Sequence, residues 1–184
     1  MSTTRTKAPA SDTDAGAVPA EPTIFRRLFT VLRIFTGLVW LSNGIAKVLE
    51  RGSYDLGFFS FSLVTKSSAR GQLSGAADRT YIRPLGWFYQ SAVLPHWGFW
   101  GVFLTLAELA IGIGLILGIA SRLAALGGLL QIGPVWIMLW HTDLYLWEYP
   151  EDLFLLLLLT IAPAGRRLGM DGRLAARFGY RWPF

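Results

Sequence analysis

The stretch HWGFWGVFLTLAELAIGIGLILGIASR, residues 96–122, decides the fold, because it is apolar over a length that crosses a bilayer yet carries one carboxylate, Glu108. A helix rises about 1.5 Å per residue, and about 20 apolar residues span the hydrocarbon core. A charged side chain at mid-membrane costs about 3 kcal/mol, so Glu108 should face protein or water rather than lipid. We therefore expect its partner on another helix.

The helical periodicity of this stretch also places Glu108 on one definite face. At about 3.6 residues per turn, a single stripe holds Trp97, Gly101, Leu104, Glu108, Gly112 and Leu115. Glycines on such a stripe let a neighbouring backbone approach closely, although each glycine alone is also compatible with an ordinary helix contact. The pattern predicts that the Glu108 face packs inward.

The composition is that of an integral membrane protein. Hydrophobic residues make up 53% of the 184 residues and charged residues only 16%, unlike a soluble domain. The formal charge of +5 comes largely from arginines beside apolar stretches, so we expect a lipid bilayer as partner and no nucleic acid. The chain has no cysteine and only two histidines, which argues against thiol redox chemistry and against a haem or metal site.

Four apolar segments predict an all-α integral membrane four-helix bundle. We expect a disordered cytoplasmic tail at 1–23, a transmembrane domain at 24–171 and a basic cytoplasmic tail at 172–184. The expected spans are 25–49, 97–120, 122–142 and 144–164, with a long outer loop at 50–95. The last apolar run is too short to span alone, so its helix should begin near Leu144.

Basic residues indicate the orientation of this bundle. Arginines precede the first span, lie between the second and third, and follow the fourth, whereas the connection after the third carries acids and no lysine or arginine. Basic residues favour the cytoplasmic side, so both termini should be cytoplasmic and the long first loop outside. The sequence thus predicts a multi-pass protein of the plasma (cytoplasmic) membrane.

Polar residues on other spans are candidates for the partner of Glu108. Depth along the helices puts Asn43 and Gln131 near the level of Glu108, and Arg33 below it within reach of a long side chain. We expect Glu108, Arg33, Asn43 and Gln131 to form an intramembrane polar site, with no catalytic residue assigned. Lys47 shares a helix face with Arg33 and is expected to extend outward to the membrane surface.

A second group of charges is expected at the outer end of the bundle. It comprises Lys47, His141, Glu148, Glu151 and Asp152. Solvation at the outer surface and entry of a proton or cation explain these charges about equally well. Both interpretations stay open at the level of sequence.

The connection at 50–95 has two parts of different composition. Residues 67–80, SSARGQLSGAADRT, are small and polar and predict an exposed loop. Residues 81–100 are dense in Trp, Tyr and Phe, which concentrate at membrane interfaces. This second part is expected to be an interfacial anchor, or a lid or mouth for an amphipathic ligand.

Several of these motifs together resemble the DoxX/DoxD family of small four-span membrane proteins. The resemblance is carried by Arg33-Ile-Phe-Thr-Gly37 continuing to Asn43-Gly44-Ile-Ala-Lys47, by Glu108-Leu-Ala-Ile-Gly112-Ile-Gly114 with Leu117-Gly118-Ile-Ala-Ser121-Arg122, and by Arg167-Leu-Gly169-Met-Asp171. It covers roughly residues 28–175 in order. The long connection at 50–95 and the tail are departures from the shorter members.

The resemblance implies a membrane subunit of a redox complex. DoxD-like members form a subunit of thiosulfate:quinone oxidoreductase, and DoxX-like members are linked to oxidative-stress and sulfur metabolism. A quinone is then the expected small molecule, and other redox subunits or further copies of the chain are the expected partners. Two alternatives stay open: a non-catalytic membrane anchor or assembly protein, and a small-solute or proton transporter with Glu108 as a relay.

Overall fold

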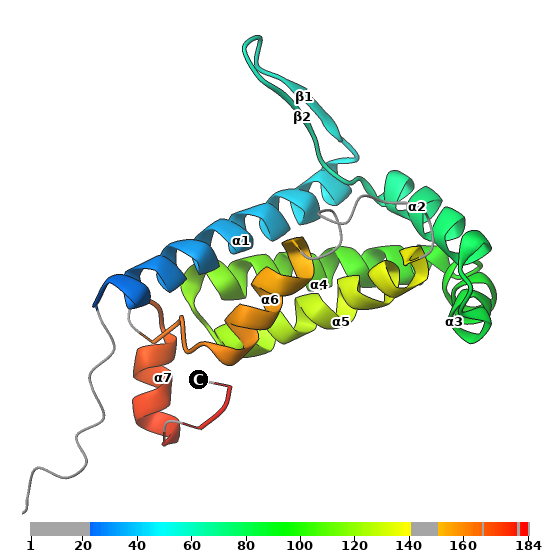
Figure 1. Ribbon diagram of the computed structural model, residues 1–184. Coiled ribbons are helices and arrows are strands. Elements are labelled where there is room, and N and C mark those ends of the chain that lie inside the picture. The colour runs from blue at the N-terminus through cyan, green and yellow to red at the C-terminus, as the bar shows by residue number, and fades with distance from the viewer. Residues whose placement is uncertain (1–22, 141–150, 167, 180, 184) are drawn as a thin grey trace, which may run out of the picture.

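The computed structural model describes residues 23–140, 151–166, 168–179 and 181–183, and this part of the chain is mostly helical. Its elements are α1 (Thr23–Leu49), β1 (Ser53–Asp55), β2 (Ser60–Ser62), α2 (Lys66–Arg79), α3 (Arg83–Phe88), the short π-helix η1 (Tyr89–Val93), α4 (Trp97–Leu117), α5 (Ser121–Leu139), α6 (Glu151–Ile161) and α7 (Asp171–Phe178). The long helices lie side by side, and α2 and α3 gather at one end of them (Figure 1).

Three helices, α1, α4 and α5, are long and apolar enough to cross a membrane. Of these, α1 and α4 run antiparallel and pack most closely. A Cβ added to Gly112 of α4 would stand 2.6 Å from the backbone nitrogen of Leu41 of α1, an approach that only glycine allows. The predicted inward packing of the Glu108 face is confirmed at this contact.

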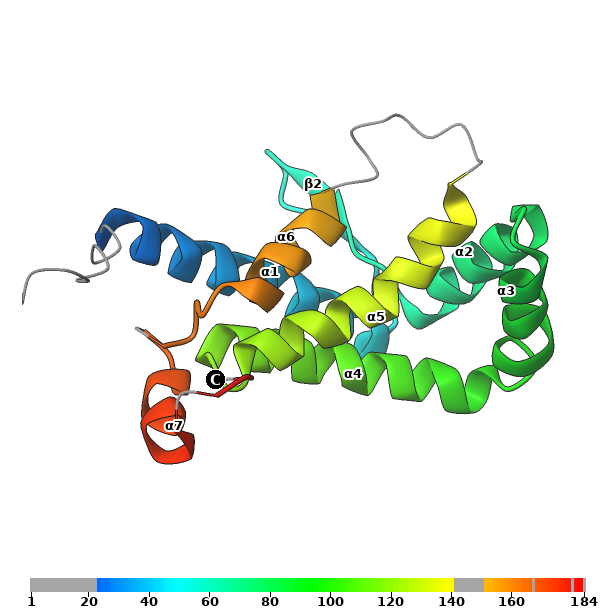
Figure 2. The ribbon, with the colours of Figure 1, turned by 60° about the horizontal axis from the view of Figure 1, so that its bottom comes forward.

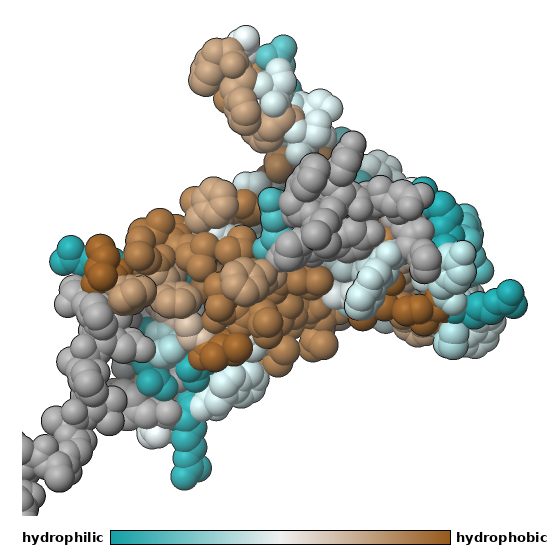
Figure 3. All heavy atoms as spheres, in the orientation of Figure 1, coloured by the Kyte–Doolittle hydropathy of each residue, from teal (hydrophilic) through white to brown (hydrophobic). Residues whose placement is uncertain are grey.

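The long helices expose apolar side chains over most of their outer surface. Phe35 and Leu38 of α1, Phe103 and Leu106 of α4, and Leu130 of α5 are each at least half exposed. Figure 3 shows the resulting apolar band along the helices, with hydrophilic residues gathered toward the two ends. Soluble monomers rarely expose continuous apolar patches larger than a few hundred Å², so this surface is the kind that a bilayer covers.

The helix α6 lies alongside α5 (Figure 2) and closes the apolar core. Its Leu156 and Leu159 are buried with Leu115 and Ala125. In the described part of the chain α6 has 11 residues, about 16 Å of helix, which is shorter than a bilayer core. The expected start of this helix near residue 144 and residues 1–22 of the expected tail at 1–23 lie outside the described residues, so the fourth span stays a prediction.

The connection at 50–95 contains a hairpin and three short helices, and the expected exposed loop at 67–80 is wrong. That segment forms most of α2. Thr65 caps the helix, because its hydroxyl accepts the Ser68 backbone N–H at 3.1 Å while the Ser68 hydroxyl accepts the Thr65 N–H at 2.9 Å. Leu73 and two alanines of α2 are buried, packed with Met138 of α5.

The expected tail at 172–184 is also partly helical. Residues 171–178 form α7, which lies below the end of the bundle where α4 ends and α5 begins (Figure 1). Asp171 and Ala175 of α7 are buried. This helix is therefore part of the packed fold rather than a free extension.

Candidate functional site

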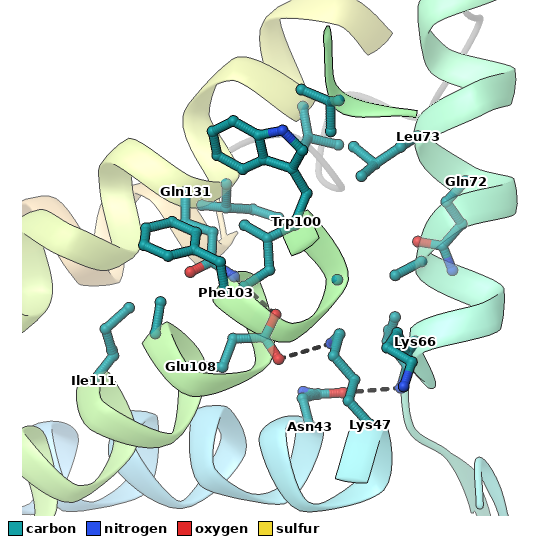
Figure 4. A pocket seen from close by; sticks show the side chains of 18 of the residues that line it. Asn43, Lys47, Lys66, Gln72, Leu73, Trp100, Phe103, Glu108, Ile111 and Gln131 are labelled. Atoms are coloured by element: carbon teal, nitrogen blue, oxygen red, sulfur yellow. Dashed lines mark hydrogen bonds and ion pairs between the residues drawn. The ribbon is translucent and has the colours of Figure 1, made fainter. Parts of the chain in front are cut away.

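A cavity of about 630 Å³ lies between α1, α4 and α5 on one side and the α2–η1 segment (residues 66–93) on the other. Most of its lining side chains are apolar or aromatic, among them Trp40, Trp97, Trp100 and Phe103. The lining also includes the polar side chains of Asn43, Lys47, Lys66, Gln72, Glu108 and Gln131 (Figure 4). The cavity is thus an apolar space with a small number of polar groups.

Glu108 lies on the wall of this cavity, about halfway along α4. Its Oε2 is 2.7 Å from Nζ of Lys47, which donates a hydrogen bond and forms an ion pair. Its Oε1 accepts a hydrogen bond from Nε2 of Gln131 at 2.9 Å. We call Lys47, Glu108 and Gln131 the polar trio; each comes from a different long helix, and Figure 4 shows them converging on the carboxylate.

Both charges of the polar trio are buried. The side chains of Lys47 and Glu108 are only 5% and 11% exposed. Removing one partner of a buried pair leaves an uncompensated charge, which typically costs 3–5 kcal/mol. The carboxylate is therefore held in place by charge pairing as well as by its hydrogen bonds.

The structure confirms that Gln131 contacts Glu108 but corrects the expected place of Lys47. Lys47 does not extend outward; it turns into the bundle. The register of the antiparallel helices explains this, because Gly44 of α1 packs on Leu109 of α4. Lys47, almost one turn after Gly44, then stands beside Glu108, and its ammonium group pairs with the carboxylate at 2.7 Å.

The polar trio has hydrogen-bonding capacity left over. Among the described residues, Lys47 and Gln131 each direct one side-chain hydrogen bond to Glu108. An ammonium group carries three N–H donors and a carboxamide two, so within the described part of the chain donors remain on both. A carbonyl oxygen entering the cavity can bond to Lys47 or Gln131, with the Glu108 carboxylate beside it as a proton acceptor.

Asn43 lines the same cavity but does not bond to Glu108. Its Oδ1 accepts the backbone N–H of Val64 at 2.9 Å, and its Nδ2 donates to the carbonyl of Val39 at 3.1 Å. Asn43 thus fastens the chain just before α2 to α1. Its role among the described residues is to hold one wall of the cavity in position.

Arg33 lies away from the polar trio, so its expected place beside Glu108 is wrong. Its Nη1 donates to the carbonyl of Leu115 at 2.7 Å, and its Nη2 donates to that of Leu168 at 3.1 Å. Leu115 is about 10 Å beyond Glu108 along α4. In the antiparallel register Arg33 faces Gly118 at the end of α4, where its guanidinium satisfies the Leu115 carbonyl left free by the helix terminus and the Leu168 carbonyl before α7.

The same end of the bundle holds Asp171, which the sequence indicates only through the family resemblance. Its carboxylate accepts the backbone N–H groups of Ala120 at 2.6 Å and Ser121 at 2.9 Å, and the Ser121 hydroxyl at 2.5 Å. Asp171 therefore caps the start of α5 from 50 residues away. A long-range cap leaves no local pattern in the sequence.

Only part of the expected outer-end group of charges can be placed. Glu151 is exposed in the first turn of α6. His141, Glu148 and the side chain of Asp152 lie outside what the structure describes. At the edge of the cavity the structure places an ion pair that sequence analysis missed, Lys66 with Glu50, at 3.8 Å and about 40% exposed on both sides.

Comparisons with known proteins leave this site as the main basis for a functional assignment. No family model, curated protein or solved structure matches the chain. Within the described ranges, no three His, Cys, Asp or Glu side chains group as ligands for a metal ion. The cavity and the polar trio are therefore the features of the chain that indicate a function.

Proposed function

We propose that this chain is a DoxX-like membrane subunit of a redox complex and that its cavity binds a quinone. The observation that carries the proposal is the buried polar trio on the wall of a cavity lined mainly by apolar and aromatic side chains. Small-molecule sites commonly have this form, with apolar walls and a few convergent polar groups.

The dimensions of the cavity support a ring with part of an apolar tail. A volume of about 630 Å³ falls within the usual range for ligand pockets. Along α4 the lining residues run from Trp97 to Ile111, about 21 Å of helix. Trp100 and Phe103 offer flat faces on which a quinone ring can stack.

The polar trio supplies the chemistry that a quinone needs. Reduction to the quinol takes two electrons and two protons. Donors on Lys47 and Gln131 stabilise the charge that develops on a quinone oxygen, and Glu108 takes up each proton from water and passes it to that oxygen. A chain without cysteine has no thiol pair to supply the electrons, and in this proposal they come from another subunit.

The proposal places α1, α4, α5 and a longer α6 across the plasma membrane, with both termini in the cytoplasm. Three helices of sufficient length support the placement. Arg27 near the start of α1, Arg122 near the start of α5 and Arg173 on α7 gather at one end of the bundle, which supports that end as cytoplasmic (Figure 1). The cavity then lies toward the outer side of the membrane.

Quinone binding is testable on the purified protein in nanodiscs, with decylubiquinone as the probe. Because tryptophans line the cavity, bound quinone should quench their fluorescence saturably. Gln131→Leu removes one donor and should weaken binding by about tenfold. Gln90→Leu is the matched control, since Gln90 bonds to Asp78 outside the cavity. Unsaturable quenching of the wild type, or equal binding by both variants, contradicts the proposal.

Membership in a redox complex requires a separate experiment. Native mass spectrometry after gentle extraction from the native membrane should find the chain with a redox subunit and with quinone. Recovery of a partner complex without quinone favours the assembly-protein alternative. A homo-oligomer that carries only phospholipid argues against the redox assignment and favours a transporter or a structural protein.

A further inference from the structure

The hairpin formed by β1 and β2 (residues 53–62) has one aromatic and one polar face. Tyr54 pairs with Phe61 across the strands, with ring centroids 5.2 Å apart, and Phe59 stacks on Phe61 at 5.8 Å. The alternate register positions hold Ser53 and Ser62, and Asp55 and Ser60. Successive side chains of a strand point to opposite faces, so the aromatic and polar sets are separated.

The turn of the hairpin is held by hydrogen bonds and exposes apolar side chains. Asp55 Oδ1 accepts the backbone N–H of Gly57 at 2.9 Å and the hydroxyl of Ser60 at 3.2 Å, while Gly57 adopts a positive φ of 81°. Phe58 at the turn is 91% exposed, and Phe59 is 57% exposed. A two-stranded hairpin alone is at best marginally stable in water, so an uncovered aromatic face calls for an apolar partner.

The position of the hairpin indicates which partner covers it. α1 ends at Leu49 and β1 begins at Ser53, so the hairpin follows the apolar helix almost directly. Figure 1 shows it leaving the end of α1 across, rather than along, the axis of the long helices. In Figure 3 its apolar side lies toward the apolar band of the bundle, and its hydrophilic side lies away from it.

We propose that this hairpin is an interfacial anchor that lies in the headgroup region of the same bilayer. Its aromatic face rests against the acyl chains and its polar face meets water. Exposed Ile45, Val48 and Leu49 extend the apolar surface of α1 up to the hairpin, which makes the contact continuous. Aromatic side chains favour this zone of the membrane.

Arg51 at the base of the hairpin fits the same location. Its guanidinium lies 5.6 Å from the centre of the Tyr54 ring, so a cation is held beside the aromatic face at the level where lipid phosphates lie. The hairpin thereby sets the depth of the adjoining end of α1, which carries Lys47. The inference rests on the transmembrane placement proposed above and is independent of the ligand.

The chain has no cysteine, so single cysteines can be introduced at will and spin-labelled. We would compare Phe58→Cys on the hairpin, Leu38→Cys on the exposed face of α1, and Arg70→Cys on the exposed face of α2, in nanodiscs of phosphatidylcholine and phosphatidylglycerol. Collisions of a spin label with oxygen show that the label lies in lipid, and collisions with a water-soluble nickel chelate show that it lies in water. The label at 58 should report a depth between the labels at 70 and 38.

Each other outcome has a distinct meaning. If the label at 58 is as accessible to nickel as that at 70, while the label at 38 meets oxygen, the helices span the membrane and the anchor proposal fails. If the label at 38 also meets nickel, the transmembrane placement itself fails. If labels at 58 broaden one another until diluted with unlabelled protein, the aromatic face binds a second copy and the anchor proposal is overturned.

Discussion

Replacing Lys47 by methionine tests the polar trio most directly. Methionine keeps an unbranched apolar side chain of similar length but removes the ammonium group that lies 2.7 Å from Glu108. Breaking a pair as buried as this one costs about 3–5 kcal/mol. Gln131 still donates to the carboxylate, so we expect the lower end, about 3 kcal/mol of the free energy of unfolding.

The measurement is unfolding in mixed micelles by titration with dodecyl sulfate, followed by circular dichroism at neutral pH. Lys66→Met is the matched control, because Lys66 and Glu50 are 3.8 Å apart and both about 40% exposed. Loss of this ion pair should change the free energy of unfolding by no more than the experimental error. The double variant Lys47→Met/Glu108→Gln leaves no buried charge and should recover most of the loss. Equal effects of Lys47→Met and Lys66→Met, or additive effects in the double variant, would refute the reasoning.

The contact of α4 with α1, the cap on α5 and the burial of Tyr89 can each be tested by substitution. Gly112→Ala should destabilise the protein by about 2 kcal/mol in the same titration, because the new Cβ meets the Leu41 backbone, whereas Gly98→Ala in the same helix has open space and should not. Asp171→Asn weakens the cap on α5 and should lower the free energy of unfolding by about 2 kcal/mol. It should also speed tryptic cleavage within α7, and unchanged cleavage would contradict this role of Asp171. Burial raises the pKa of Tyr89, because it favours the neutral phenol in the folded state. The contribution of this phenol to the free energy of unfolding is therefore present below about pH 10 and is lost as the pH rises through the raised pKa. Tyr89→Phe should reduce this loss of stability at alkaline pH, measured as melting temperature against pH.

The long helices could be predicted from sequence because their signal is local. The expected spans 25–49, 97–120 and 122–142 match α1, α4 and α5 to within a few residues. α2 was missed because its serines, glycines and alanines give little apolar periodicity, although two buried alanines pack it onto α5. Its helical state depends on a cap and on distant contacts rather than on its own pattern.

The candidate site could be predicted in part. Glu108 and Gln131 stand out because each interrupts an apolar run, and the requirement for a partner applies to any buried carboxylate. The sequence did not indicate which cation pairs with Glu108, because Arg33 and Lys47 share one face of the same helix. A lysine near a helix end has two available environments, the membrane surface and the bundle interior.

The amino-acid pattern is sufficient to establish three apolar helices of membrane-spanning length, one of which carries a carboxylate that cannot face lipid, because length and polarity are properties of each segment alone. The spatial register of α1 against α4 determines which polar side chains meet. Contacts at Gly44 and Gly112 set that register, which brings Lys47 to Glu108 and carries Arg33 to the far end of α4. No segment contains this information, since it arises from the closest approach of two backbones that are distant in sequence.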